Sequence, residues 1–211
     1  MTETRGTATG LAVGLATFAA ATLVGAAEAS VVTFNSNPGL EGLGVFTGEM
    51  EWNYLGANAG TLRVSLTNTS PVENGGYLTG FAFNSVYALQ IKMAEGGARP
   101  GWIDIDDVNA PPLGVFDHGA ALGGDWLGGG SPLAGIGVGQ TFDFLFDVRG
   151  DPTLLSSLVA HDFFDESDGW GFAARFRGFD DGGSDKVTAS MPAPGAIALF
   201  GLGALGARRR R

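Results

Sequence analysis

The chain lacks cysteine and carries only two histidines among its 211 residues. Without cysteine it can form no disulfide, no thiolate metal site and no cysteine nucleophile. The G-x-S-x-G, H-E-x-x-H and P-loop motifs of serine hydrolases, zinc peptidases and nucleotide-binding enzymes are also missing from the sequence. Because no catalytic pattern stands out, we predict a protein that is not an enzyme.

Positive charge is scarce as well. The chain has 12 lysines and arginines against 22 aspartates and glutamates, which gives a formal net charge of −10. Residues 30–190 are more acidic still, with twenty acidic and seven basic side chains. Such a surface repels nucleic acid and anionic head groups, so we expect no nucleic-acid partner. The acidity serves solubility in one interpretation and divalent-cation binding in another.

Glycine, by contrast, is abundant, with 36 residues. That is more than double the average share of about 7%. Helix interiors disfavour glycine because it loses the most backbone entropy on folding, whereas strands joined by many turns tolerate it better. The 15 phenylalanines supply enough apolar volume for a core. The composition therefore favours a folded, β-rich domain.

Alternation of apolar and polar residues predicts most of the strands. In Met50, Trp52 and Tyr54 the apolar side chains take every second position, as expected for one buried and one solvated face. The glycines at 56 and 60 predict a hairpin turn before the next alternating segment. The strands expected on these grounds cover residues 31–34, 49–54, 61–67, 77–83, 86–93, 102–105, 141–148, 169–176 and 186–189.

These segments predict an all-β fold, an antiparallel β-sandwich or jelly roll. One short helix is expected from Asp151, which can cap it, through Pro152 at the first helical position to about residue 160. Residues from Asp106 to Gln140 are expected to form one long loop. An N-terminal signal helix and a C-terminal hydrophobic helix are expected to flank this domain.

Residues 1–29 have the layout of a secretory signal peptide. Arg5 precedes an apolar stretch from Leu11 to Ala26, and Ala27-Glu28-Ala29 places small residues where signal peptidase needs them. We therefore expect signal peptidase to cleave after Ala29. An uncleaved membrane helix is the alternative.

Residues 191–211 combine three features. The tripeptide Pro192, Ala193 and Pro194 comes first, and residues 196–207 follow without a charge. Four basic residues come last: Arg208, Arg209, Arg210 and Arg211. A helix over 196–207 is about 18 Å long, against a hydrocarbon core of about 30 Å. This length suits transient anchoring, with the arginines as a stop at the cytoplasmic face.

This arrangement resembles the PEP-CTERM sorting signal, with Ala193 where the usual tripeptide has glutamate. The resemblance covers residues 191–211 only. It implies a Gram-negative exported protein whose tail is recognised and cleaved by an exosortase, a protease of the inner membrane. It also implies passage through the inner membrane, transient anchoring there, and delivery to the cell surface or to an extracellular polysaccharide matrix.

Two candidate sites lie in the predicted domain, residues 30–190. Oxygen ligands at short spacing suit calcium, and four such side chains occur together at Asp104, Asp106, Asp107 and Asn109. A solvated strand edge explains the same residues equally well. Trp126, in a glycine-rich segment, is the candidate for contact with a sugar, and burial as a packing residue is its alternative.

From these observations we expect an exported envelope or matrix protein with a structural or adhesive role. A calcium-dependent carbohydrate-binding module is the first alternative. A secreted glycan hydrolase is the second, since paired carboxylates in a cleft can cleave glycosidic bonds.

Overall fold

The computed structural model describes residues 29–167 and 169–192. The predicted signal helix, Ala193, Pro194, the hydrophobic helix and the four arginines at 208–211 lie outside the described residues. Within the described ranges, no helix is both long enough and apolar enough to cross a membrane.

The described chain consists of strands, one α-helix and three single turns of 3₁₀ helix. The α-helix α1 spans Pro152–Ser157, and the 3₁₀ turns lie at Val72–Asn74, Pro132–Ala134 and Ala160–Phe163. The strands are β1 (Ser30–Ser36), β2 (Phe46–Gly56), β3 (Ala59–Asn68), β4 (Gly75–Phe83), β5 (Gln90–Met93), β6 (Trp102–Asn109), β7 (Val115–Leu122), β8 (Ile136–Gly137), β9 (Thr141–Arg149), β10 (Phe172–Phe179) and β11 (Ser184–Ser190).

All of these strands belong to one antiparallel sheet. Its hydrogen-bonded order is β5-β9-β3-β2-β1-β11-β10-β4-β7-β6, and β8 pairs with β4 beside this path. The sheet curls until its two end strands, β5 and β6, come into contact. The expectation of a predominantly β, antiparallel fold with one short α-helix is thus confirmed. A single sheet supplies both layers that a sandwich would build from two.

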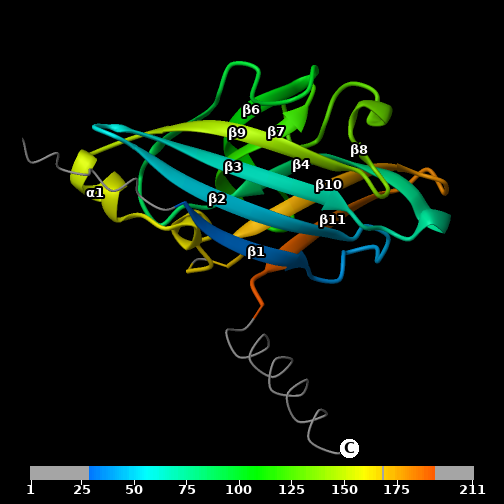
Figure 1. The fold of residues 1–211 in the computed structure, drawn as a ribbon. Coiled ribbons are helices and arrows are strands. Elements are labelled where there is room, and N and C mark those ends of the chain that lie inside the picture. The colour runs from blue at the N-terminus through cyan, green and yellow to red at the C-terminus, as the bar shows by residue number, and fades with distance from the viewer. Residues whose placement is uncertain (1–28, 168, 193–211) are drawn as a thin grey trace, which may run out of the picture.

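The main core lies between the facing halves of the curled sheet (Figure 1). Phe34 of β1 packs on Phe172 of β10 with 4.6 Å between ring centroids, and Phe81 of β4 packs on Phe144 of β9 at 4.7 Å. Because these side chains take alternate positions along their strands, period-two alternation identified most of them in the sequence. The outward residues of β2, β3 and β9 are polar or partly exposed.

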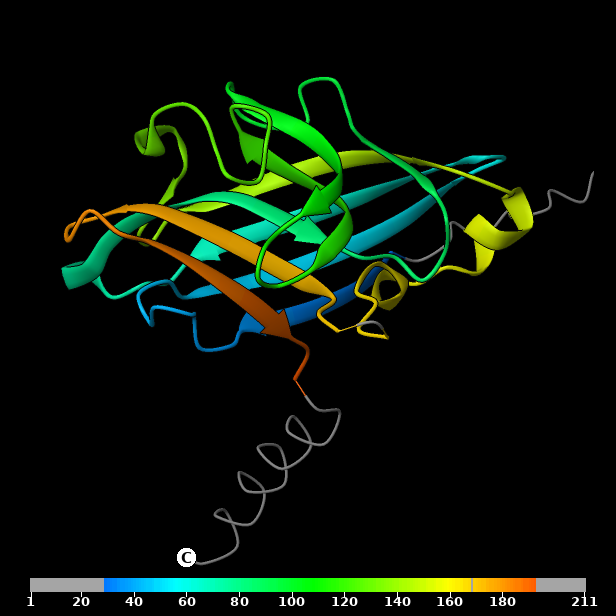
Figure 2. The ribbon, with the colours of Figure 1, turned by 180° about the vertical axis from the view of Figure 1, so that it is seen from behind.

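A smaller core covers the outer face of the sheet around β4, β7 and β10. It contains Phe116, Ala121, Trp126 and Ala173, all buried. The loop that follows β7 lies over this face and carries Trp126 (Figure 2). Neighbouring residues of β7 therefore serve different cores: Ala120 packs into the main core and Ala121 into the outer one.

The prediction of one long loop from Asp106 to Gln140 is wrong over much of that range. It contains the end of β6, all of β7 and the short strand β8. The last four residues of β7 are buried on both faces of the sheet, so they show no alternation of apolar and polar residues. A strand covered on both sides cannot be recognised by a period of two.

Other boundaries differ from the expectation as well. The strand expected over residues 169–176 runs from Phe172 to Phe179, so Trp170 lies outside it. The strand expected over residues 86–93 begins only at Gln90. Helix α1 starts as expected, since the Asp151 carboxylate accepts hydrogen bonds from the N–H groups of Thr153 (2.9 Å) and Leu154 (3.1 Å). It ends earlier, at Ser157, because Leu158 is extended.

The β2–β3 hairpin is confirmed, and it shows why glycine is needed at position 60. The Trp52 ring lies across Gly60, and a Cβ atom on Gly60 would stand 2.0 Å from the ring. The indole in turn packs on Phe163 with 5.1 Å between ring centroids. The glycine thus lets a large side chain close this end of the main core.

Candidate functional site

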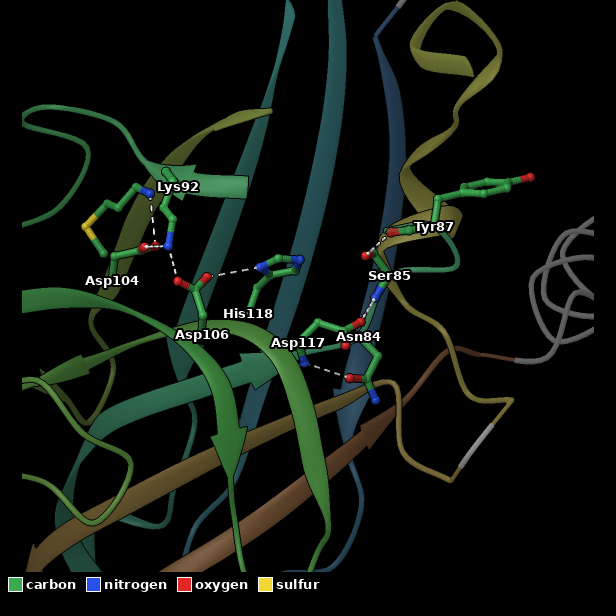
Figure 3. A network of polar contacts seen from close by, with 9 residues as sticks. Asn84, Ser85, Tyr87, Lys92, Asp104, Asp106, Asp117 and His118 are labelled. Atoms are coloured by element: carbon green, nitrogen blue, oxygen red, sulfur yellow. Dashed lines mark hydrogen bonds and ion pairs between the residues drawn. The ribbon is translucent and has the colours of Figure 1, made fainter. Parts of the chain in front are cut away.

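A groove of about 650 Å³ lies where the two end strands of the sheet meet. One wall comes from the segment that leads into β5, and the other from the facing part of β6 and β7. The lining residues are 85–92, Asp106, Asp107, Asp117 and His118. Figure 3 shows the polar contacts that organise this region.

Lys92 of β5 joins the two end strands. Its ammonium group lies 3.2 Å from a carboxylate oxygen of Asp104 and also pairs with Asp106, both on β6. The backbone N–H of Met93 donates to the other Asp104 oxygen at 3.0 Å. The hydrogen bond to Asp106 is the largest cause that raises the pKa of Lys92 above its ordinary value. Burial opposes it with the next largest effect, and the hydrogen bond to Asp104 raises the pKa further.

The register of the β6–β7 ladder brings His118 into this cluster. Asp106 and His118 stand opposite each other, and His118 Nδ1 lies 3.4 Å from a carboxylate oxygen of Asp106. On its other side the imidazole packs on Phe83, with 5.7 Å between ring centroids. His118 therefore has a fixed place between the core and the groove.

A second set of hydrogen bonds fixes the segment before β5. Asn84 accepts from the backbone N–H of Asp117 at 3.0 Å, and Asp117 accepts from the backbone N–H of Ser85 at 3.1 Å. The Ser85 hydroxyl donates to the carbonyl of Tyr87 at 2.8 Å. These contacts tie the turn that carries Tyr87 to strand β7.

Tyr87 stands at the rim of the groove, with 42% of its surface exposed. The sequence places it on one strand face with Leu89 and Ile91, but only the latter two are buried. Because the strand begins four residues later than expected, Tyr87 lies outside it and does not follow the alternation. Its ring points away from the Lys92 cluster.

The structure brings Trp126 together with part of the predicted calcium cluster. A second hollow, of about 370 Å³, is lined by Trp126 and by Asp106, Asp107, Asn109 and Asp125. Trp126 itself is only 4% exposed, and its carbonyl accepts from Arg175 at 3.2 Å. Burial lowers the pKa of Arg175, and the neighbouring Arg177 adds to this effect.

The four predicted calcium ligands lie on one strand but have different surroundings. Asp104 and Asp106 face Lys92, whereas Asp107 and Asn109 are exposed. Across residues 29–167 and 169–192, no three histidine, aspartate or glutamate side chains are grouped so that they could hold a metal ion. Calcium binding stays a prediction.

Sequence reasoning did not identify Lys92, Tyr87 or Asp117 as members of a site. They come from two segments far apart in the sequence, 85–92 and β7, which only the curled sheet brings together. Polar Gln90 and Lys92 fit the alternation expected over 86–93, so no local signal in the sequence marks a site there. Comparison of the chain with models of protein families, with curated proteins and with solved structures gave no match.

Proposed function

We propose that the chain is an exported bacterial protein of the cell envelope or extracellular matrix, with a β-sandwich-type ectodomain over residues 30–190. Signal peptidase removes residues 1–29, and an exosortase-type protease acts on the PEP-CTERM-like segment 191–211. The mature protein has a non-catalytic, structural or adhesive role linked to exopolysaccharide.

One observation carries the proposal: every strand of the sheet lies between the two address segments. Strand β1 begins at Ser30, directly after the predicted cleavage position Ala29. Strand β11 ends at Ser190, directly before the segment with the proline tripeptide. Removing both segments would therefore take no residue from any strand of the sheet, which supports their interpretation as removable.

The groove supports a binding role over a hydrolytic one. Glycoside hydrolysis needs one carboxylic acid and one carboxylate, both available to the substrate. In the groove, Asp106 is engaged by Lys92 and His118, and Asp117 accepts a hydrogen bond from the Ser85 backbone. These carboxylates already hold the seam and its turn in place.

The test is cell fractionation combined with mass spectrometry of the mature ends. The full-length chain is expressed in a Gram-negative host that has an exosortase, beside a variant that stops after residue 190. We expect the full-length chain to reach the surface or the medium with Ser30 as its first residue and without Arg208–Arg211. The truncated variant is expected to lose surface delivery while its signal peptide is still removed.

A variant lacking residues 2–29 is the matched control and is expected to stay in the cytosol. Full-length protein that is found in the cytosol with both ends intact would contradict the proposal. So would identical delivery of the full-length and truncated chains.

A further inference from the structure

We propose that the groove between β5 and β6 binds a neutral glycan segment, with Tyr87 as its aromatic contact. This inference names the ligand class for the proposed adhesive role, and it rests on the proposed function only for the extracellular source of the glycan. The groove has a volume of about 650 Å³, which lies within the range of about 300–1,000 Å³ that is usual for small-molecule sites.

Hydroxyl groups both donate and accept hydrogen bonds, and the groove offers partners for both. Asp107, which is exposed in the groove, presents carboxylate oxygens, and these accept strong hydrogen bonds from hydroxyls. Gln90 and His118 contribute an amide and an imidazole from the opposite walls. A purely apolar ligand would leave these groups unpaired, at a cost in binding free energy.

Tyr87 adds the apolar surface that a sugar ring requires. In Figure 3 its ring points outward from the rim, away from Lys92, so a bound chain would extend from the carboxylates past the rim to reach the aromatic face. Aromatic rings combine a large apolar face with low conformational freedom, which suits them to packing against the C–H face of a pyranose. The turn that carries Tyr87 is already fixed by Ser85 and Asp117, so binding needs little ordering of the chain.

Charge excludes anionic ligands. Asp106, Asp107 and Asp117 outnumber the one permanently charged cation of the groove, Lys92. Lys92 is also held by Asp104 and Asp106, so its charge is already balanced. The whole chain is acidic too, at −10, so phosphate-rich or uronate-rich chains are repelled before they reach the groove.

The test uses the full-length chain, purified from whole cells in mild detergent so that the result does not depend on its location. The probe is an array of neutral oligosaccharides (glucans, mannans and galactans) printed beside uronate-containing ones. We expect retention on neutral oligosaccharides and none on uronates. Titration calorimetry with a retained neutral oligosaccharide then gives the affinity of each variant.

Replacement Y87A is expected to weaken binding at least about fivefold, the loss of roughly one aromatic contact. Trp170, 43% exposed and outside the groove lining, provides the matched control, and W170A is expected to leave affinity within about twofold. Asp107→Asn, at an exposed position, removes a carboxylate with little change in shape and is expected to weaken binding about threefold or more.

Circular dichroism checks that each variant keeps its fold. The inference is overturned if no neutral oligosaccharide is retained, if uronates are preferred, or if Y87A and W170A have equal effects. Since the protein is taken from whole cells, glycan binding can fail while export succeeds, and export can fail while the groove still binds.

Discussion

At the residue scale, Asp185 shows how an acidic side chain in a turn-rich segment can belong to the interior. It is 1% exposed. Its carboxylate accepts four backbone N–H groups, from Lys186 (2.7 Å), Leu43 (2.9 Å), Glu41 (3.0 Å) and Gly44 (3.0 Å). Four donors satisfy a buried carboxylate without a cation and fix the 39–44 loop on β11.

We predict that Asp185→Asn lowers the free energy of unfolding by about 2–3 kcal/mol. The amide keeps one acceptor oxygen but turns an NH₂ group toward backbone N–H groups that lose their partner. Denaturant unfolding measures the effect. Asp181→Asn is the control, since Asp181 is exposed in the hairpin turn before β11, and it is expected to change stability by less than about 0.5 kcal/mol. Equal effects of the two replacements would show that the N–H cluster does not stabilise the fold.

Composition alone could not separate Asp185 from Asp180 and Asp181, because all three stand in the same acidic, glycine-rich stretch. What distinguishes Asp185 is its neighbour in space, the 39–44 loop, where a Cβ atom on Gly39 would clash with the Asp185 carboxylate. The burial of the phenylalanines was easier to predict, because alternation within a single strand sufficed to place Phe142, Phe144 and Phe146 in the core.

At the scale of elements, the acidic run of β6 acquires a structural explanation. β6 is an end strand of the sheet, and its carboxylates at Asp104, Asp106 and Asp107 stand along that edge. Charged side chains on an edge strand discourage pairing with another chain. The residues that suggested calcium in the sequence thus also protect the edge at which the groove lies.

The loop over the outer core is held by two arginines of β10 as well as by Trp126. Arg175 donates to the carbonyl of Trp126, and Arg177 donates to the carbonyl of Gly129 at 2.7 Å. Sequence reasoning placed Trp126 in a glycine-rich segment but could not choose between contact with a sugar and burial. The choice depends on which face of β10 the loop covers. Because β10 lies far from the loop in the sequence, local patterns cannot show this contact.

We predict that Trp126→Ala destabilises the protein by about 3–5 kcal/mol, because it empties the outer core beneath the loop. Limited proteolysis is expected to cut the loop between residues 123 and 135 faster than in the unmodified protein. Leu127→Ala is the matched control at the neighbouring, exposed position, with an expected change below about 0.5 kcal/mol. Unchanged stability of Trp126→Ala would instead favour the ligand-contact hypothesis.

At the scale of the whole molecule, side chains join the two end strands of the sheet, which are not neighbours in its hydrogen-bonded order. β5 and β6 end the strand order, and the ion pairs of Lys92 with Asp104 and Asp106 bridge them. The Lys92 side chain is 62% exposed, so solvent screens these pairs. Their contribution to global stability is therefore expected to stay below about 1 kcal/mol, while their effect on the local opening of the seam is larger.

We predict that Lys92→Met increases hydrogen exchange at the Met93 amide, whereas Lys92→Arg preserves its protection.

The pKa of Lys92 is raised in the folded state, so the stability that its charge adds is fully present below about pH 10.4, the ordinary lysine value. That stability is lost as the pH rises through the raised pKa. Unfolding measured from pH 7 upward should show wild type and Lys92→Met converging only in strong alkali. Convergence at neutral pH would refute this.

The meeting of β1 and β11 has a consequence for the order of assembly. Only two residue pairs join these strands in the ladder, Asn35 with Ser190 and Ser36 with Ala189, and the Ser190 hydroxyl reaches Asn37 across 153 positions of sequence. Until the last strand has been synthesised, β1 and β10 each keep an open edge, and pairing so distant in sequence forms slowly. A nascent chain of this protein therefore stays incompletely folded, with strand edges open to pairing with other chains, until β11 has been synthesised.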